Sequence, residues 1–144
     1  MLSPPVRLAL SRNLIALLFC SMGVLHLVVP APFLRVMPPI FPFPYVLVII
    51  SGIFEFLGGV GVLMERVRRM VGIGLIALLI VVYPVNIYMF LHQIQTHVWD
   101  LWSTALLVRL PLQFVMIWWV YRSAYLQLSA NGENASFAQR SSHL

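Results

Sequence analysis

The stretch YVLVIISGIFEFLGGVGVLM, residues 45–64, decides the fold, because it runs for twenty residues with a single charged side chain, Glu55. A helix of about 20 apolar residues is long enough to cross the roughly 30 Å hydrocarbon core of a bilayer. Small residues share one face of this helix with Glu55, at Gly52, Gly58 and Gly59. Small residues let helices approach closely in a membrane. The stretch therefore predicts a transmembrane helix with one acid on its packed face.

Three further apolar runs of similar length lie around this stretch, at residues 13–29, 70–91 and 101–121. Of the 144 residues, 61% are apolar and 9% are charged, whereas a soluble domain has about 45–50% and about 25%. This composition excludes a soluble enzyme domain and a disordered chain, and the lone Cys20 excludes a disulfide-stapled scaffold. We expect an all-α, integral membrane four-helix bundle over residues 1–122, followed by a polar, disordered tail over residues 123–144.

Charged and proline residues outside the spans predict the orientation and the connections. The nine basic residues are all arginines, and with four spans only Arg35 falls on the side opposite to Arg7, Arg12, Arg66, Arg68, Arg69, Arg122 and Arg140. Because cytoplasmic segments carry the excess of basic residues, both termini are expected to be cytoplasmic, and topology explains the net charge of +5 without nucleic-acid binding. The absence of lysine suggests a GC-rich bacterial gene and hence the bacterial inner membrane. Six prolines between residues 30 and 44 predict an irregular loop.

Polar side chains inside the predicted spans are the candidate site. All four spans contribute, and the residues are His26, Glu55, Asn86, Arg109 and Gln113. At about 1.5 Å of rise per residue, they lie in the outer half of the membrane or near its midplane. Because an unpaired charge there costs several kcal/mol, we expect Glu55 to pair with Arg109, and Asn86 and Gln113 to satisfy the remaining donors and acceptors.

Two interpretations of this polar cluster remain open. Intramembrane charges are candidates for a ligand or proton site, which is the slightly favoured interpretation, but a Glu55–Arg109 pair can also serve only to fix helix register and topology. For His26, which lies near the outer end of its span, an ordinary satisfied histidine is the favoured interpretation. The chain contains no nucleotide-binding glycine loop, catalytic triad signature or zinc motif, so no metal site is predicted.

Short motifs along the chain resemble the DoxX-like family of small four-span membrane proteins. The matching residues are 23–26, 38–39, 51–55, 58–59, 83–89 and 109–113. The family takes its name from a subunit of a thiosulfate:quinone oxidoreductase, and some relatives are tied to redox stress or thiol handling. The chain has no cysteine pair, so a dithiol role does not carry over.

The resemblance implies a redox-associated subunit that binds quinone or another small lipophilic ligand, with redox proteins of the membrane or its surface as partners. Arg109, Asn86, Gln113 and His26 would donate hydrogen bonds to the ligand, and Glu55 would accept a proton. The alternative is a non-enzymatic scaffold, assembly factor or chaperone whose polar cluster is structural. A small transporter is less favoured, because four spans without a repeat are few unless the chain forms a homo-oligomer.

Overall fold

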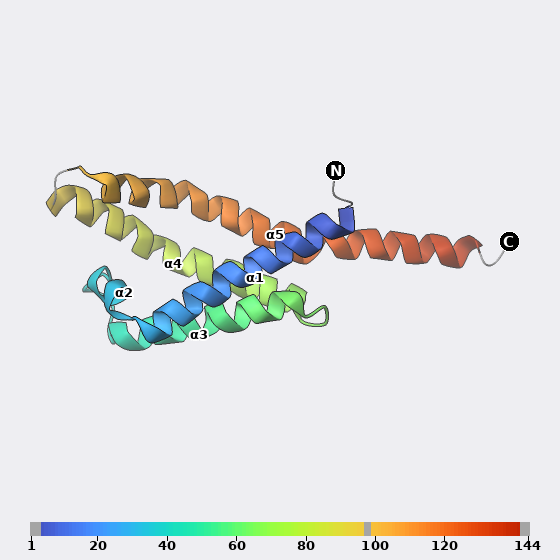
Figure 1. Cartoon of the computed structure of the whole chain (residues 1–144), viewed down its shortest axis with the longest axis horizontal. Coiled ribbons are helices and arrows are strands. Elements are labelled where there is room, and N and C mark those ends of the chain that lie inside the picture. Colours follow the sequence, from blue (N-terminus) through green and yellow to red (C-terminus); the bar gives the residue numbers. More distant parts are fainter. Residues whose placement is uncertain (1–3, 97–98, 142–144) are drawn as a thin grey trace.

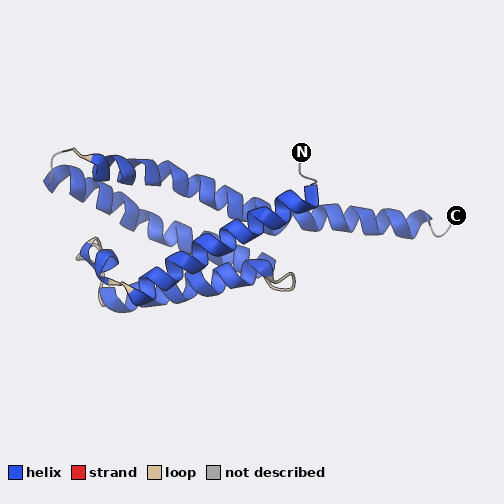
Figure 2. Cartoon of the chain, viewed as in Figure 1, coloured by secondary structure: helices blue, strands red, loops and turns tan. Residues whose placement is uncertain are grey.

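The structure, a computed structural model, describes residues 4–96 and 99–141, which form helices joined by short connections (Figures 1 and 2). The helices are α1 (Pro4–Val28), α2 (Ala31–Arg35), α3 (Pro44–Leu63), α4 (Arg68–Thr96) and α5 (Leu101–Ser141). Four segments are long and apolar enough to cross a membrane, namely Val6–Val28, Pro44–Leu63, Arg68–Gln95 and Ser103–Tyr125. The prediction of an all-α chain with four apolar spans is confirmed, which indicates a multi-pass membrane protein.

The four long helices pack as two antiparallel pairs, α1 with α3 and α4 with α5 (Figure 1). The start of α1, the end of α5 and the turn between α3 and α4 lie at one end of the molecule, which we call the terminal end. The helix α2 lies at the opposite end, which we call the α2 end. The two pairs meet toward the terminal end and diverge toward the α2 end.

Glycines bring the backbones of α1 and α3 into direct contact. A Cβ on Gly23 would lie 2.6 Å from both the carbonyl oxygen of Gly52 and the amide nitrogen of Phe56. A Cβ on Gly59 would lie 2.9 Å from the carbonyl oxygen of Ala16. Backbone atoms at these distances leave no room for a side chain, so the small residues of α3 produce the close packing that the sequence predicts.

A buried apolar cluster joins all four long helices toward the terminal end. It consists of Ile15 and Phe19 of α1, Val62 of α3, Leu75 of α4 and Val120 of α5.

Arg68, the first residue of α4, caps the end of α3 across the α3–α4 turn. The Nε of Arg68 donates to the carbonyl of Val62 over 2.8 Å, so a positive charge caps the carboxyl end of α3.

The proline-rich connection contains a short helix rather than only an irregular loop. The helix α2 begins at Ala31, and Pro32 lies in its first turn. Proline is tolerated there because the first amides of a helix have no partner within the helix. Before α3 begins at Pro44, Phe43 adopts a left-handed backbone with φ 55°. This sharp turn separates α2 from α3.

The helix α5 extends beyond the predicted end of the fourth span at residue 121. It continues to Ser141, through most of the segment that the sequence predicts to be a disordered tail, and residues 142–144 lie outside the described part. Residues 122–141 contain no proline, the strongest helix breaker, and a single glycine, Gly132, which costs about 1 kcal/mol within a helix. The apolar part of α5 ends near Tyr125.

Candidate functional site

Close packing of α1 on α3 places His26 beside Glu55. The Nδ1 atom of His26 lies 3.2 Å from Oε2 of Glu55, and the two side chains are 12% and 14% exposed. Gly52, almost one turn before Glu55, makes this approach possible, because a Cβ there would lie 2.7 Å from Cβ of His26. The small-residue face of α3 therefore positions the histidine as well as the helix that carries it.

The ring of His26 has contacts on two further sides. Its Nδ1 lies 2.9 Å from the carbonyl oxygen of Met22, one turn earlier in α1. Its face stacks on Phe33 of α2, with ring centroids 3.7 Å apart and planes at 20°. Because Nδ1 lies between two oxygen acceptors, it carries a hydrogen, and the bond to Met22 uses that hydrogen. Oxygen Oε2 of Glu55 is buried and has no hydrogen-bond partner among the described residues.

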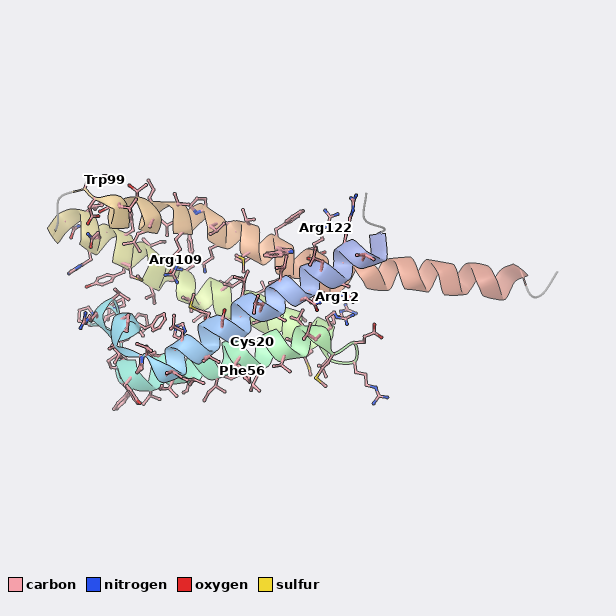
Figure 3. All side chains as sticks on the ribbon, viewed as in Figure 1. Arg12, Cys20, Phe56, Trp99, Arg109 and Arg122 are labelled. Carbon is pink, nitrogen blue, oxygen red and sulfur yellow. The ribbon has the colours of Figure 1, made fainter. Side chains whose placement is uncertain are left out.

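The predicted ion pair between Glu55 and Arg109 is not formed, which corrects the expectation from the sequence. Arg109 belongs to α5, in the other helix pair, and interacts electrostatically with both Glu55 and His26. Within the described part of the chain, its guanidinium makes no hydrogen bond or ion pair. The two helix pairs diverge toward the α2 end, and Arg109 (labelled in Figure 3) extends from α5, so its guanidinium does not reach the acid on α3.

Asn86 and Gln113 form a separate network inside the α4–α5 pair. The Nδ2 of Asn86 donates to Oε1 of Gln113, and Nε2 of Gln113 donates to the backbone carbonyl of Leu79. Both side chains belong to residues that are 5% exposed. Pro84 has no N–H and interrupts the backbone hydrogen bonds of α4 near this carbonyl. The two amides therefore satisfy each other and do not complete the coordination of Glu55.

The five predicted residues thus divide into two groups. His26 contacts Glu55 and both interact electrostatically with Arg109 of a third helix, whereas Asn86 and Gln113 join α4 to α5. Sequence reasoning did not include Phe33, whose ring covers His26. The alternation of phenylalanines with prolines in residues 30–44 was the available signal, since aromatic side chains in such a connection can fold back onto a span.

The first group combines complementary chemistry across the two helix pairs. Glu55 offers a buried acceptor without a donor, and a guanidinium has five N–H donors and no acceptor. Groups so arranged can hold a third polar group between them. The hydrogen-bonding capacity of the group is therefore complementary to a molecule that both accepts and donates hydrogen bonds.

Comparisons with known proteins place the chain at the level of a family. Searches of curated proteins and of solved structures gave no match. The family model described as a domain of unknown function, DUF8561, matches residues 15–124, which include every residue of both polar groups and the apolar cluster. The chain therefore belongs to the DUF8561 family.

Proposed function

We propose that this chain binds a small lipophilic ligand of the quinone class between its two helix pairs, at His26, Glu55 and Arg109. The observation that carries the proposal is the buried Oε2 of Glu55, which has no hydrogen-bond partner in the described structure and interacts electrostatically with Arg109 of the opposite pair. A polar group without a partner costs free energy in an apolar environment. A ligand that supplies the partner would recover it.

The two oxidation states of a quinone match the two sides of this site. A quinone carbonyl accepts hydrogen bonds, so it would bind the guanidinium of Arg109. A quinol hydroxyl donates, so it would bind Oε2 of Glu55. The ring of Phe33, stacked on His26, offers an apolar surface beside these polar groups. The site therefore favours a ligand with polar oxygens at opposite edges of a flat apolar body.

A redox-associated role in the bacterial inner membrane, with both termini cytoplasmic, is part of the same proposal. It is supported by the resemblance to DoxX-like proteins and by the arginines. Arg35 lies in α2, whereas Arg7, Arg12, Arg66, Arg68, Arg69 and Arg122 belong to segments near the terminal end. The excess of basic residues at the terminal end favours a cytoplasmic location for it.

A scaffold or assembly role is the second candidate, and the amide network favours it. Asn86, Gln113 and the carbonyl of Leu79 form two hydrogen bonds that connect α4 to α5 without any ligand. If the His26–Glu55 contact also serves only to hold α1 on α3, then no ligand is required. The two candidates differ in what they predict for Arg109, which makes no ion pair between helices among the described residues. A ligand-binding role requires Arg109 for binding, whereas a scaffold role does not require it.

The test compares site variants with charge-matched variants in the α3–α4 turn. Glu55→Gln and Arg109→Met alter the site, and Glu65→Gln and Arg66→Met make the same changes at exposed positions. The melting temperature of each purified protein is measured in detergent with and without decylubiquinone. Ligand at a hundred times its Kd stabilises a protein by about 2.7 kcal/mol, a shift that is readily measured.

We expect decylubiquinone to raise the melting temperature of the wild type and of both turn variants. It should not change the melting temperature of Glu55→Gln or of Arg109→Met. Arg109→Met should still fold, since Arg109 makes no ion pair in the described structure, and Glu55→Gln should still fold, because glutamine keeps the size and shape of the side chain beside His26. Absence of any shift in the wild type contradicts the quinone-class proposal. A full shift in Arg109→Met contradicts the assignment of the site.

A further inference from the structure

A cavity of about 390 Å³ lies at the terminal end, between the beginning of α1 and the later part of α5. The lining residues come from one face of each helix and are Arg7, Leu8, Ser11, Trp118, Trp119, Arg122 and Ser123. This volume falls in the range of about 300–1,000 Å³ that is typical of small-molecule sites. The cavity shares no residue with the site at Glu55, so a ligand bound here would be independent of the proposed quinone site.

The charge of the cavity wall is positive. Two of the seven lining residues are arginines, and no carboxylate lines the cavity among the described residues. The guanidinium of Arg122 lies 5.3 Å from the centre of the Trp118 ring, a cation–π contact that restrains this arginine beside the cavity. Guanidinium groups bind phosphate through paired N–H donors, so two of them at one cavity favour a phosphate-bearing anion.

The polar groups on the inner wall leave one hydroxyl hydrogen unused. Nε1 of Trp119 donates to Oγ of Ser11 over 2.6 Å, and Oγ of Ser11 lies 2.9 Å from Oγ of Ser123. These three groups carry three hydrogens, and the two hydrogen bonds use two of them. Whichever serine donates to the other, the remaining hydrogen belongs to a hydroxyl that lines the cavity. An anion in the cavity would accept it.

The position of the cavity suits the phosphate layer of a bilayer. The apolar segment of α5 ends at Tyr125, and the lining residues of α5 lie within its last two turns. Tryptophan and arginine are typical of this depth, where lipid headgroups replace hydrocarbon. The serines and arginines therefore lie where a lipid phosphate can reach them without leaving the membrane surface.

We propose that this cavity binds a phosphate-bearing anion through Arg7, Arg122 and the Ser11–Ser123 hydroxyls. The phosphate has two possible sources, the headgroup of an anionic phospholipid and a free phosphate compound. The lipid arm of the test uses dihexanoyl phosphatidylglycerol, with dihexanoyl phosphatidylcholine for comparison. The soluble arm uses inorganic phosphate, with chloride at equal ionic strength for comparison.

The full-length protein in a neutral detergent is titrated in each arm, and the change in melting temperature is recorded. The site variant is Arg7→Gln with Arg122→Gln. The matched control, called the turn control, is Arg66→Gln with Arg69→Gln, which removes the same charge from the α3–α4 turn and the first turn of α4, outside the cavity. A lysine variant, Arg7→Lys with Arg122→Lys, keeps the charge and loses the paired N–H donors of each guanidinium.

We expect the site variant to weaken the apparent affinity for phosphatidylglycerol about tenfold, the lysine variant to weaken it less, and the turn control to leave it unchanged. Stabilisation by inorganic phosphate equal to that by phosphatidylglycerol assigns the site to a free phosphate compound, and stabilisation by the lipid alone assigns it to a headgroup. An equal loss in the site variant and the turn control shows only general attraction to basic residues and overturns the proposal. So does an unchanged affinity in the site variant.

Discussion

The α1–α3 pair and the α4–α5 pair are held together by different interactions. In the first, Gly23 and Gly59 bring two backbones into contact, with no room for a single added methyl group. In the second, Asn86 and Gln113 connect the helices through side-chain hydrogen bonds. Lipid tails are as apolar as leucine, so burial of apolar side chains does not by itself associate helices in a membrane. Close packing and hydrogen bonds remain, and backbone contact at glycines predominates in the first pair, whereas hydrogen bonds between side chains distinguish the second.

The difference determines where the unsatisfied polar group lies. Within α4–α5 the polar side chains of Asn86 and Gln113 are hydrogen-bonded to each other and to the Leu79 carbonyl. Within α1–α3 the glycine contacts bring the backbones together, and Glu55 lies beside His26 but keeps an acceptor oxygen without a hydrogen-bond partner among the described residues. A group that the fold leaves unsatisfied is available for a ligand.

The largest effect is expected from Gly23→Ala. The added Cβ would lie 2.6 Å from backbone atoms of α3, which cannot move aside separately from their helix, so we expect a loss of about 3 kcal/mol in the free energy of unfolding. The control is Gly74→Ala, because Gly74 has nothing within 4 Å of the added Cβ. That variant should gain up to about 1 kcal/mol from helix propensity. Unfolding is followed by circular dichroism during titration with a denaturing detergent, and equal stabilities of the two variants would refute the role of close packing.

A smaller effect is expected from the amide network of α4–α5. Gln113→Leu leaves Asn86 and the Leu79 carbonyl without their partner, and we expect a loss of about 1–2 kcal/mol. The double variant Asn86→Leu with Gln113→Leu should cost less than the sum of the single variants, because it removes both members of the pair. The same detergent titration measures all three variants. Strict additivity would show that the two amides do not interact.

The cap at the turn between the two pairs is expected to contribute about 1 kcal/mol. Arg68→Met removes the donor to the Val62 carbonyl and the positive charge at the carboxyl end of α3. Arg66→Met, at an exposed position in the same turn, should change the free energy of unfolding by less than about 0.5 kcal/mol. A similar cost for both variants would mean that the overall charge of the turn, and not the cap, stabilises this connection.

The smallest expected effect is the coupling between Glu55 and Arg109. Because the two side chains form no ion pair, the stability changes of Glu55→Gln and Arg109→Met should add to within about 0.5 kcal/mol in the double variant. This double-mutant cycle is measured in the absence of ligand. A coupling energy above about 1 kcal/mol would show that the two helix pairs close on each other in the membrane and that the charges pair directly.

Much of the candidate site could be predicted from the sequence, but not its pairing. Polar residues inside apolar runs can be recognised from the sequence alone. Each polar side chain in a membrane span costs free energy, so its presence indicates a structural or functional role. His26, Glu55 and Arg109 were found in this way. Which of them touch depends on the rotation of each helix about its axis and on the distance between helices. The contact of His26 with Glu55, in place of Arg109, follows from the approach of α1 at Gly52.

The order of residues along the chain was enough to determine the four spans, the small-residue face of α3 and the set of polar side chains inside the apolar runs. These features are local, because hydrophobicity and helical spacing act over about twenty residues of one chain segment. The packing of the helices in space was needed to decide that Asn86 pairs with Gln113, that the helix pairs diverge toward α2, and that two arginines line a cavity at the terminal end. Those features depend on how closely helices that are distant in sequence approach each other. A single methyl group added at a glycine such as Gly23 would be enough to change the distance between two helices.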